Sequence, residues 1–300
     1  MFIINYRKIF FGISVVLMTL SIFAMVSFGF NFGIDFVGGS IYEVNYLENR
    51  PEIDTLKTLV DKAQIQNYSV TPSGQSNYII RMSEITPDQK TVLKNYLEDN
   101  GKYSLKEERF NSIGPVVGNE LKNKAFAAIS VVLVCIVLFI TFAFRKVSKP
   151  VSSWKYGLAT VIALAHDVII PTGIFITWIH FNGGQIDVLF VSAILAILGY
   201  SVHDTIVVFD RVRENLTHNQ GSKSNESFDQ VVGKSLMQTM GRSINTSLTT
   251  FIVLVFLYFM GGESTKDFIF VLIIGIITGT YSSIFIASPI LVTLQKLQKN

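Results

Sequence analysis

The chain has 300 residues, of which 49% are hydrophobic and only 16% are charged, with a formal net charge of +3. Because about a quarter of the residues of a typical soluble domain are charged, this composition excludes an ordinary soluble protein. The charges are also segregated, since residues 35–124 hold 11 of the 25 Lys/Arg and 13 of the 22 Asp/Glu. This distribution predicts a soluble domain inserted into a membrane protein, and we attribute the small positive charge to loops rather than to nucleic-acid binding.

Six apolar stretches are long enough to cross a membrane, which takes about 20 helical residues. The predicted transmembrane helices are residues 9–34, 125–144, 156–180, 186–209, 236–260 and 268–294. The first is too long for the apolar part of a signal peptide, and no small-residue cleavage site follows it. The single cysteine, Cys135, lies in the second stretch, so the chain has no disulfide framework.

The distribution of Lys and Arg predicts the orientation of these helices, because cytoplasmic loops are enriched in both. Basic residues without acidic ones flank the start of the first helix and follow the second: Arg7, Lys8, Arg145, Lys146, Lys149 and Lys155. We therefore expect both termini and the polar loop 210–235 in the cytoplasm. Residues 35–124 are expected on the outer side.

The outer segment is predicted to be a small α+β domain. Strand patterns occupy residues 40–46, 67–71, 77–82 and 103–110, and helices begin at Pro51 and Pro87. The resulting order, βαββαβ, is typical of a ferredoxin-like fold. The segment contains no histidine and no catalytic cluster, so we expect a binding or mechanical module.

A short motif leads from the first helix into this domain. Asp35 ends the apolar run, and Gly38 and Gly39 follow it. Two consecutive glycines permit a tight or left-handed turn. By itself this motif is consistent with a simple helix exit.

Ionisable side chains inside the predicted helices are the main functional candidates, because a charge at the centre of a membrane helix costs about 2.5–3.5 kcal/mol. His203 and Asp204 lie in the segment Gly199–Asn215, which closes the fourth helix. The alternative is that this helix ends early and that Asp204 lies at the membrane interface, because only about 9 Å of helix separates Asp204 from Asp210.

The fifth helix carries a polar stripe at positions i, i+3, i+4 and i+7, namely Arg242, Asn245, Thr246 and Thr249. The loop charges place Arg242 and Asp204 at similar depths on neighbouring helices, so these two side chains could pair. The alternative is that Arg242 is only a membrane anchor near a helix end.

His166 and Asp167 are two more ionisable residues, in the third predicted helix, about 18 Å beyond Lys155. Near the middle of the membrane an unpaired charge is most costly. This pair either takes part in ion transfer or makes structural hydrogen bonds to neighbouring helices.

The remaining features indicate packing rather than chemistry. Gly275, Gly279, Ser283 and Ala287 form a small-residue ridge that allows close helix packing. The sequence has no P-loop, zinc motif or nucleophile elbow, so we expect no enzyme, cofactor or metal. Two acids on neighbouring helices would also suit an intramembrane aspartyl protease, but the Gly-x-Gly-Asp context of those enzymes is missing at Gly199–Asp204.

Four segments together resemble the SecD/SecF family of protein-export membrane proteins, which are half-size members of the RND transporter superfamily. They are Gly33–Gly39, Ala165–Val168, Gly199–Asn215 with its Asp210-Arg211 pair, and Gln238–Ser243. The resemblance covers nearly the whole chain. It implies a membrane α-helical half transporter of six spans with one external ferredoxin-like domain.

The resemblance also implies a function and a set of partners. The family promotes protein translocation across the bacterial cytoplasmic (inner) membrane, using the proton motive force. A SecD partner would complete the transporter, and the pair would associate with the SecYEG translocon, with YajC and with translocating unfolded polypeptides, surrounded by membrane lipid. No nucleic acid is implied.

The family's ion-coupling residues correspond to Asp204, Arg242 and Thr246, and we add His203 and Asp167 as candidates. His203 stands where some relatives have Asn. Some relatives use sodium, so both protons and sodium ions are candidate coupling ions. The alternative function is one half of an RND-type small-molecule exporter. Such a protein should have a substrate cleft in larger or paired outer domains, which about 90 residues would hardly provide.

Overall fold

The computed structural model describes residues 2–145, 152–221 and 226–299. The chain forms two compact units. We call them the helical unit (Met1–Phe30, Ala128–Gly184 and Leu189–Asn300) and the α+β unit (Asn31–Ala127 and Gln185–Val188). The second range of the α+β unit is a four-residue segment from between two long helices, and the sequence did not predict that it packs there.

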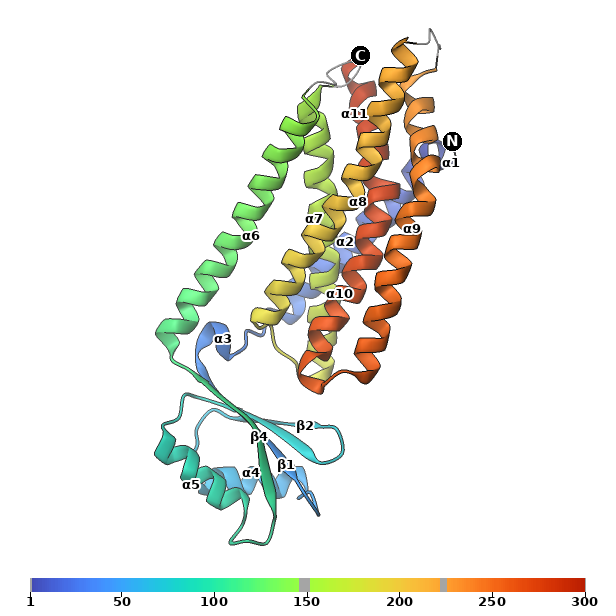
Figure 1. Cartoon of the computed structure of the whole chain (residues 1–300). Helices are drawn as coiled ribbons and strands as arrows, with labels where there is room; N and C mark the ends of the chain where they lie inside the picture. The colour runs from blue at the N-terminus through green and yellow to red at the C-terminus, as the bar shows by residue number, and fades with distance from the viewer. Residues whose placement is uncertain (1, 146–151, 222–225, 300) are drawn as a thin grey trace. The chain divides into compact units, whose positions relative to one another are not determined.

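The helical unit contains the long helices of the chain (Figure 1). The helices of this unit are α1 (Phe2–Asn5), α2 (Arg7–Phe28), α6 (Pro115–Ala143) from Ala128 onward, α7 (Ser153–Asn182), α8 (Val188–Gly221) from Leu189 onward, α9 (Phe228–Met260), α10 (Glu263–Ser282), the π-helix η1 (Ser283–Ala287) and α11 (Ser288–Lys299). Within the described ranges, six helical stretches are long and apolar enough to span a membrane. The predicted multi-pass helical architecture is therefore confirmed.

Helix α7 lies at the centre of the helical unit. It packs against α2, α10, η1 and α11. In its most apolar stretch 67% of the residues are buried, against 6% in α6. Side chains on α7 are therefore held mostly by protein, whereas few residues of α6 are fully buried in this chain.

Helices α8 and α9 extend well into the segment 210–235 that the sequence analysis assigned to a cytoplasmic loop. Arg211 on α8 donates from Nε to Gln238 Oε1 on α9 at 2.7 Å, and Asn215 donates to Ser235 Oγ at 2.8 Å. The two helices therefore form an antiparallel hairpin. Residues 222–225 of this segment lie outside the described residues, as do Lys146 and Lys149 of the basic loop.

The α+β unit contains α3 (Ile34–Val37), β1 (Gly39–Tyr46), α4 (Ile53–Lys62), β2 (Ser69–Ser73), β3 (Asn77–Met82), α5 (Pro87–Leu97) and β4 (Leu105–Ile113). The strands form one antiparallel sheet in the order β2-β3-β1-β4. Together with the chain order βαββαβ, this is the topology of a ferredoxin-like fold. The predicted domain type is confirmed.

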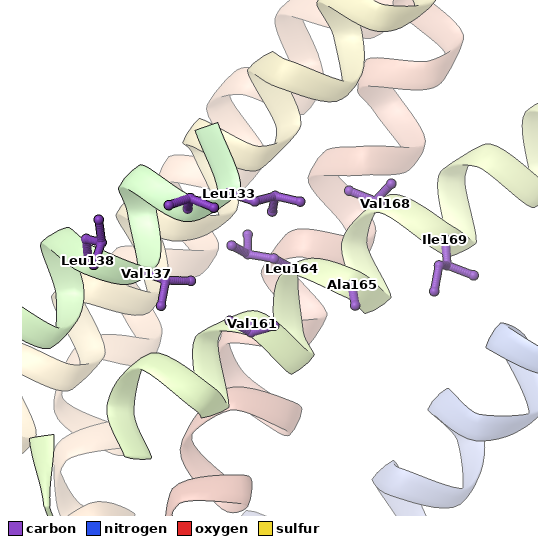
Figure 2. A pocket seen from close by; sticks show the side chains of 9 residues that line it. Leu133, Val137, Leu138, Val161, Leu164, Ala165, Val168 and Ile169 are labelled. Atoms are coloured by element: carbon purple, nitrogen blue, oxygen red, sulfur yellow. The ribbon is translucent and has the colours of Figure 1, made fainter. Parts of the chain in front are cut away.

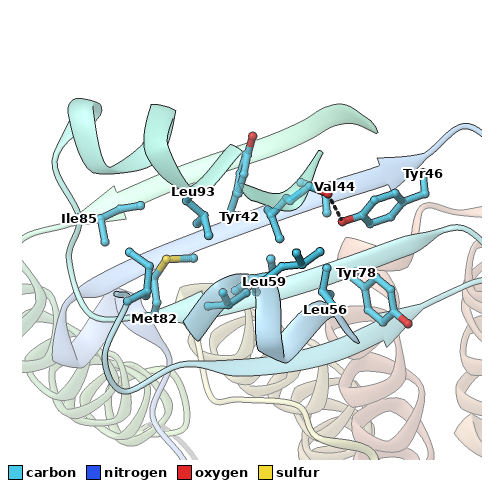
Figure 3. Close-up of a cluster of buried hydrophobic side chains, with 13 residues drawn as sticks. Tyr42, Val44, Tyr46, Leu56, Leu59, Tyr78, Met82, Ile85 and Leu93 are labelled. Atoms are coloured by element: carbon cyan, nitrogen blue, oxygen red, sulfur yellow. Dashed lines mark hydrogen bonds between the residues drawn. The ribbon is translucent and has the colours of Figure 1, made fainter. Parts of the chain in front are cut away.

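The core of this unit follows from the alternation of side chains along the central strand. Tyr42, Val44 and Tyr46 of β1 are buried on one face and pack with Leu56 of α4 and Leu93 of α5 (Figure 3). The Tyr46 hydroxyl donates to the Leu97 carbonyl at 3.4 Å. Burial raises the pKa of both tyrosines above their usual range.

The double glycine at the start of β1 is required by the backbone. Gly38 and Gly39 have φ values of 80° and 136°, so the expected left-handed turn is present. A Cβ atom at Gly38 would lie 2.7 Å from Pro115 Cα, and one at Gly39 would lie 2.7 Å from the Met82 carbonyl oxygen. Any side chain here would be both strained and in collision with backbone.

Candidate intramembrane coupling site

Asp204 is the centre of the candidate site. It lies in the middle of α8, and its side chain is buried. Its carboxylate accepts hydrogen bonds from Ser243 Oγ of α9, at 2.5 Å, and from Ser283 Oγ of η1. Hydrogen bonds to a charged acceptor are about twice as strong as neutral ones, so these two donors hold an otherwise costly acid inside an apolar helix.

The small-residue ridge of α10 and η1 brings Ser283 to Asp204. A Cβ atom at Gly275 would lie 2.1 Å from Ile197 Cδ1, and one at Gly279 would lie 3.2 Å from Ser201 Cβ. Only small residues let α10 come this close to α8. The ridge therefore does pack two helices, as expected, and its third member also supplies a hydrogen bond to the acid.

The π-helix begins at the residue that binds the acid. Such segments occur mostly as single turns inside α-helices, frequently at functional sites. Ser283 Oγ lies 3.0 Å from the Thr280 carbonyl oxygen as well as beside Asp204. The hydroxyl can therefore donate to the ionised carboxylate, or donate to the Thr280 carbonyl and accept a hydrogen bond from the protonated form of Asp204.

Asp167, on α7, is fully buried and is bound in a similar way. We call the set of hydrogen-bond donors around each buried acid its cradle. His166 Nδ1 lies 2.8 Å from one carboxylate oxygen. The other oxygen accepts from Ser201 Oγ of α8 and from Ser282 Oγ of α10, the latter at 2.6 Å. Ser282 also has an alternative acceptor, the Gly279 carbonyl at 3.0 Å.

Consecutive residues connect the two cradles. Ser282 binds Asp167, and Ser283 binds Asp204. The layer continues through Ser247 Oγ, which accepts from the Tyr200 hydroxyl at 2.9 Å and lies 2.6 Å from Thr280 Oγ1. Two acids and several hydroxyls thus form one polar layer across α7, α8, α9 and α10. Chemically, a layer of carboxyl and hydroxyl groups can take up or release a proton, and Ser282 and Ser283 each have a second acceptor for their own protons.

The serines of this layer were missed by the sequence analysis. Ser201 and Asp204 are three residues apart on one helix face, which is a spacing that could have indicated a shared environment. Ser243, Ser282 and Ser283 have no comparable signal, because single serines are common on membrane helices and bind backbone carbonyls there.

Arg242, Thr246 and His203 do not belong to the buried layer. All three are exposed in this chain, and Thr246 Oγ1 donates to the Arg242 carbonyl at 2.9 Å. Within the described residues, no hydrogen bond or ion pair joins Arg242 or His203 to Asp204. Because Ser243 points at Asp204, its neighbour Arg242 projects about 100° away around the helix. The possible Asp204–Arg242 pair is therefore not formed in this chain.

The other motif residues lie elsewhere. Gly199 is exposed with open space beside it. Asp210 pairs with Arg213 at 2.6 Å, and Arg211 pairs with Glu214 at 2.6 Å. Both ion pairs lie within α8, and Arg211 also joins α8 to α9 through Gln238. Among the residues that the structure describes, no group of three His, Cys, Asp or Glu could hold a metal ion.

An apolar groove of about 380 Å³ lies between α6 and α7 (Figure 2). It is lined by Leu133, Val134, Val137, Leu138, Val161, Leu164, Ala165, Val168 and Ile169. Ligand sites usually combine an apolar lining with a few placed polar groups. This groove offers only carbon, so it gives no support to a polar-substrate site.

The fold and the site together define a class of protein: a polytopic membrane protein with an inserted ferredoxin-like domain and a buried acidic layer between its spans. A family model described as "Protein export membrane protein SecD/SecF, C-terminal" matches residues 92–297, and one described as "SecD/SecF GG Motif" matches residues 23–46. The chain belongs to the SecD/SecF family.

Individual relatives agree with this assignment. The chain is 40% identical to the protein translocase subunit SecF of Thermobaculum terrenum, over 97% of this chain and 93% of that protein. It is 35% identical to the corresponding subunit of Sebaldella termitidis, over 98% and 91% of the two chains.

The chain is also similar to solved structures. It superimposes on the crystal structure of SecDF, a translocon-associated membrane protein from Thermus thermophilus, with a TM-score of 0.83 and 28% identity over 98% of this chain. A super-membrane-facing form of SecDF gives a TM-score of 0.68 at 27% identity. The chain spans only 38% and 39% of those two longer chains.

Proposed function

We propose that this chain is the SecF half of a SecDF complex that uses the proton motive force to promote translocation of unfolded polypeptides across the bacterial cytoplasmic membrane. The observation that carries the proposal is the cradle of Asp204, a buried acid bound by hydroxyls from two other helices. Such a site suits reversible protonation, because Ser283 has a second acceptor, the Thr280 carbonyl, available when the acid gains its proton.

In this mechanism Asp204 alternates between its ionised and protonated forms as protons cross the membrane. When it is ionised, Ser243 and Ser283 donate to it. When it is protonated, Ser283 donates to the Thr280 carbonyl instead. Since Ser283 begins η1, the change alters the packing of η1 against α8 and biases a two-state arrangement of helices. One charge crossing 100 mV supplies about 2.3 kcal/mol, which is enough for a useful bias.

Asp167 has a supporting role in the same cycle. Its donor Ser282 directly precedes Ser283, the donor to Asp204, so a change in hydrogen bonding at one acid shifts the backbone that carries the donor to the other. His203 lies beside Asp204 in sequence but faces outward, where it would line the path of the ion between the two halves. The same carboxylate and hydroxyl oxygens could also bind sodium. Measuring export driven by a sodium gradient in place of a proton gradient shows which of the two ions is coupled to export.

The exposed polar stripe on α9 supports a SecD partner. Arg242, Asn245, Thr246 and Thr249 would face lipid if the chain were alone, at a cost that membrane proteins avoid. A SecD-like half that covers the stripe would bring a counter-charge for Arg242. We propose further association with SecYEG and YajC, with both termini in the cytoplasm and the α+β unit on the outer side of the inner membrane.

A double-mutant cycle on the complex in proteoliposomes tests the proposal. Asp204→Asn cannot release a proton, so it should abolish proton-driven export and proton flux while the complex still assembles. Arg242→Met should lose the same activity through loss of its proposed charged contact with the SecD half, and the double variant should be no worse than either single one, because both side chains would serve one proton path. Asp229→Asn, which removes an acid that pairs with Lys296 on the surface, is the matched control. Normal proton flux in Asp204→Asn would refute the mechanism.

A further inference from the structure

The segment Gln185–Val188, which connects α7 to α8 and includes the first residue of α8, is part of the α+β unit. It is hydrogen-bonded to the residues that precede the double glycine. The Ile186 amide donates to the Asn31 carbonyl at 2.8 Å, and the Gly33 amide donates to the Ile186 carbonyl at 2.7 Å. These bonds make a short parallel bridge between Phe32 and Ile186, and Ile186 is buried. A Cβ atom at Gly33 would lie 3.2 Å from the Ile186 oxygen, so the backbones are in close contact.

Asp35 adds a third bond, and this bond holds the start of a helix. Its Oδ2 accepts from the Val188 amide at 3.1 Å, across 153 positions of sequence. Val188 is the first residue of α8. The first amides of a helix have no partner within the helix and carry partial positive charge. A carboxylate is therefore well suited to bind there, although such caps normally come from the adjacent residues.

The connection joins two functional elements by short routes. Along α8, Asp204 lies sixteen residues after Val188, or about 24 Å of continuous helix. Along the other route, only the rest of α3 and the two glycines separate Asp35 from β1, the central strand of the sheet. Val188 belongs to the α+β unit and Leu189 to the helical unit, so the chain itself carries a displacement of α8 to Val188.

We propose that Asp35 is a positioning residue that holds Val188, the first residue of α8, within the α+β unit and so passes the proton-dependent displacement of α8 to that unit. This inference rests on the proposed function, because it assigns a task to Asp35 in the same cycle. Asp35 takes no part in binding the proton itself. A simple helix exit would need neither the carboxylate nor the bridge to Ile186.

Three variants of the full complex separate coupling from folding. Asp35→Ala removes the acceptor, whereas Asp35→Asn keeps an oxygen that can accept from Val188. Asp54→Ala is the matched control, since Asp54 is an exposed acid in the first turn of α4 in the same unit. For each, we would measure export, proton flux and amide hydrogen exchange of residues 183–190.

We expect Asp35→Ala to exchange about tenfold faster in residues 183–190, as for loss of one hydrogen bond to a charged acceptor. It should lower export per proton severalfold while proton flux stays near normal, and Asp35→Asn should restore most of the loss. Export per proton equal to that of Asp54→Ala, or unchanged exchange, would overturn the inference. Absence of proton flux in the unmodified complex would instead overturn the proposed function.

Discussion

Removing the Ser283 hydroxyl should slow proton-driven export without preventing assembly. Asp204 has two hydroxyl donors, from Ser243 and Ser283, so Ser283→Ala removes half of its hydrogen bonds. A hydrogen bond to a charged group contributes about 1.5–3 kcal/mol. Because 1.4 kcal/mol is a factor of about ten, the step that requires ionised Asp204 should slow about tenfold or more.

The matched control is Ser288→Ala. Ser288 is also fully buried and lies just beyond η1, but its hydroxyl has no hydrogen-bond partner within the described residues. The two substitutions therefore remove the same atom from similar surroundings and differ in the bond to Asp204. Export and proton flux would be measured in proteoliposomes that contain the whole complex. Equal effects of Ser283→Ala and Ser288→Ala would refute a role for the cradle, as would additive losses in the Ser283→Ala, Asp204→Asn double variant.

Three further predictions concern orientation and the α+β unit. In a Cys135→Ala background, single cysteines at Asn67 and Ser152 should react with an impermeant maleimide from opposite sides, and labelling from one side would contradict the orientation. Gly38→Ala should destabilise the α+β unit in pulse proteolysis by at least about 1 kcal/mol more than Gly74→Ala, as for an overpacked site, because both glycines have positive φ but only Gly74 has open space for a Cβ atom; equal losses would contradict this. Burial and a hydrogen bond to Asp61 raise the pKa of Tyr68 to about 12, so the stabilisation it gives is complete below pH 10 and is lost as the pH rises through 12. The difference in absorbance between the unmodified protein and Tyr68→Phe should show that midpoint, and a midpoint near 10 would contradict it.

The features that could be predicted from the sequence are those that depend on long runs of residues. Hydropathy over about 20 residues predicted the spanning helices, and the alternation of polar and apolar residues predicted the ferredoxin-like domain. Asp167 and Asp204 were singled out because acids are costly in such surroundings. In each case the physical signal is carried by one helix or strand and needs no knowledge of its neighbours.

The features that could not be predicted depend on contacts between distant segments. Ser243 binds Asp204 and Ser282 binds Asp167, but nothing in the local sequence distinguishes these serines from Ser288, which is equally buried and has no hydrogen-bond partner in the described residues. The bond from Val188 to Asp35 crosses most of the chain. Such contacts are determined by which helices meet, and that follows from packing rather than from residue patterns.

The junction between α10 and η1 explains how two acids on different helices can respond together. Consecutive residues on a helix point about 100° apart, so Ser282 and Ser283 reach two different helices, α7 and α8, from one point of the backbone. A change from α to π winding rotates the residues on one side of the junction relative to those on the other. The geometry that suits Ser283 on ionised Asp204 therefore cannot be altered without disturbing Ser282 on Asp167. For this reason Ser282→Ala should change the proton dependence of export even though Ser282 does not touch Asp204, and a Ser282→Ala variant with an unaltered pH profile would show that the two acids act independently.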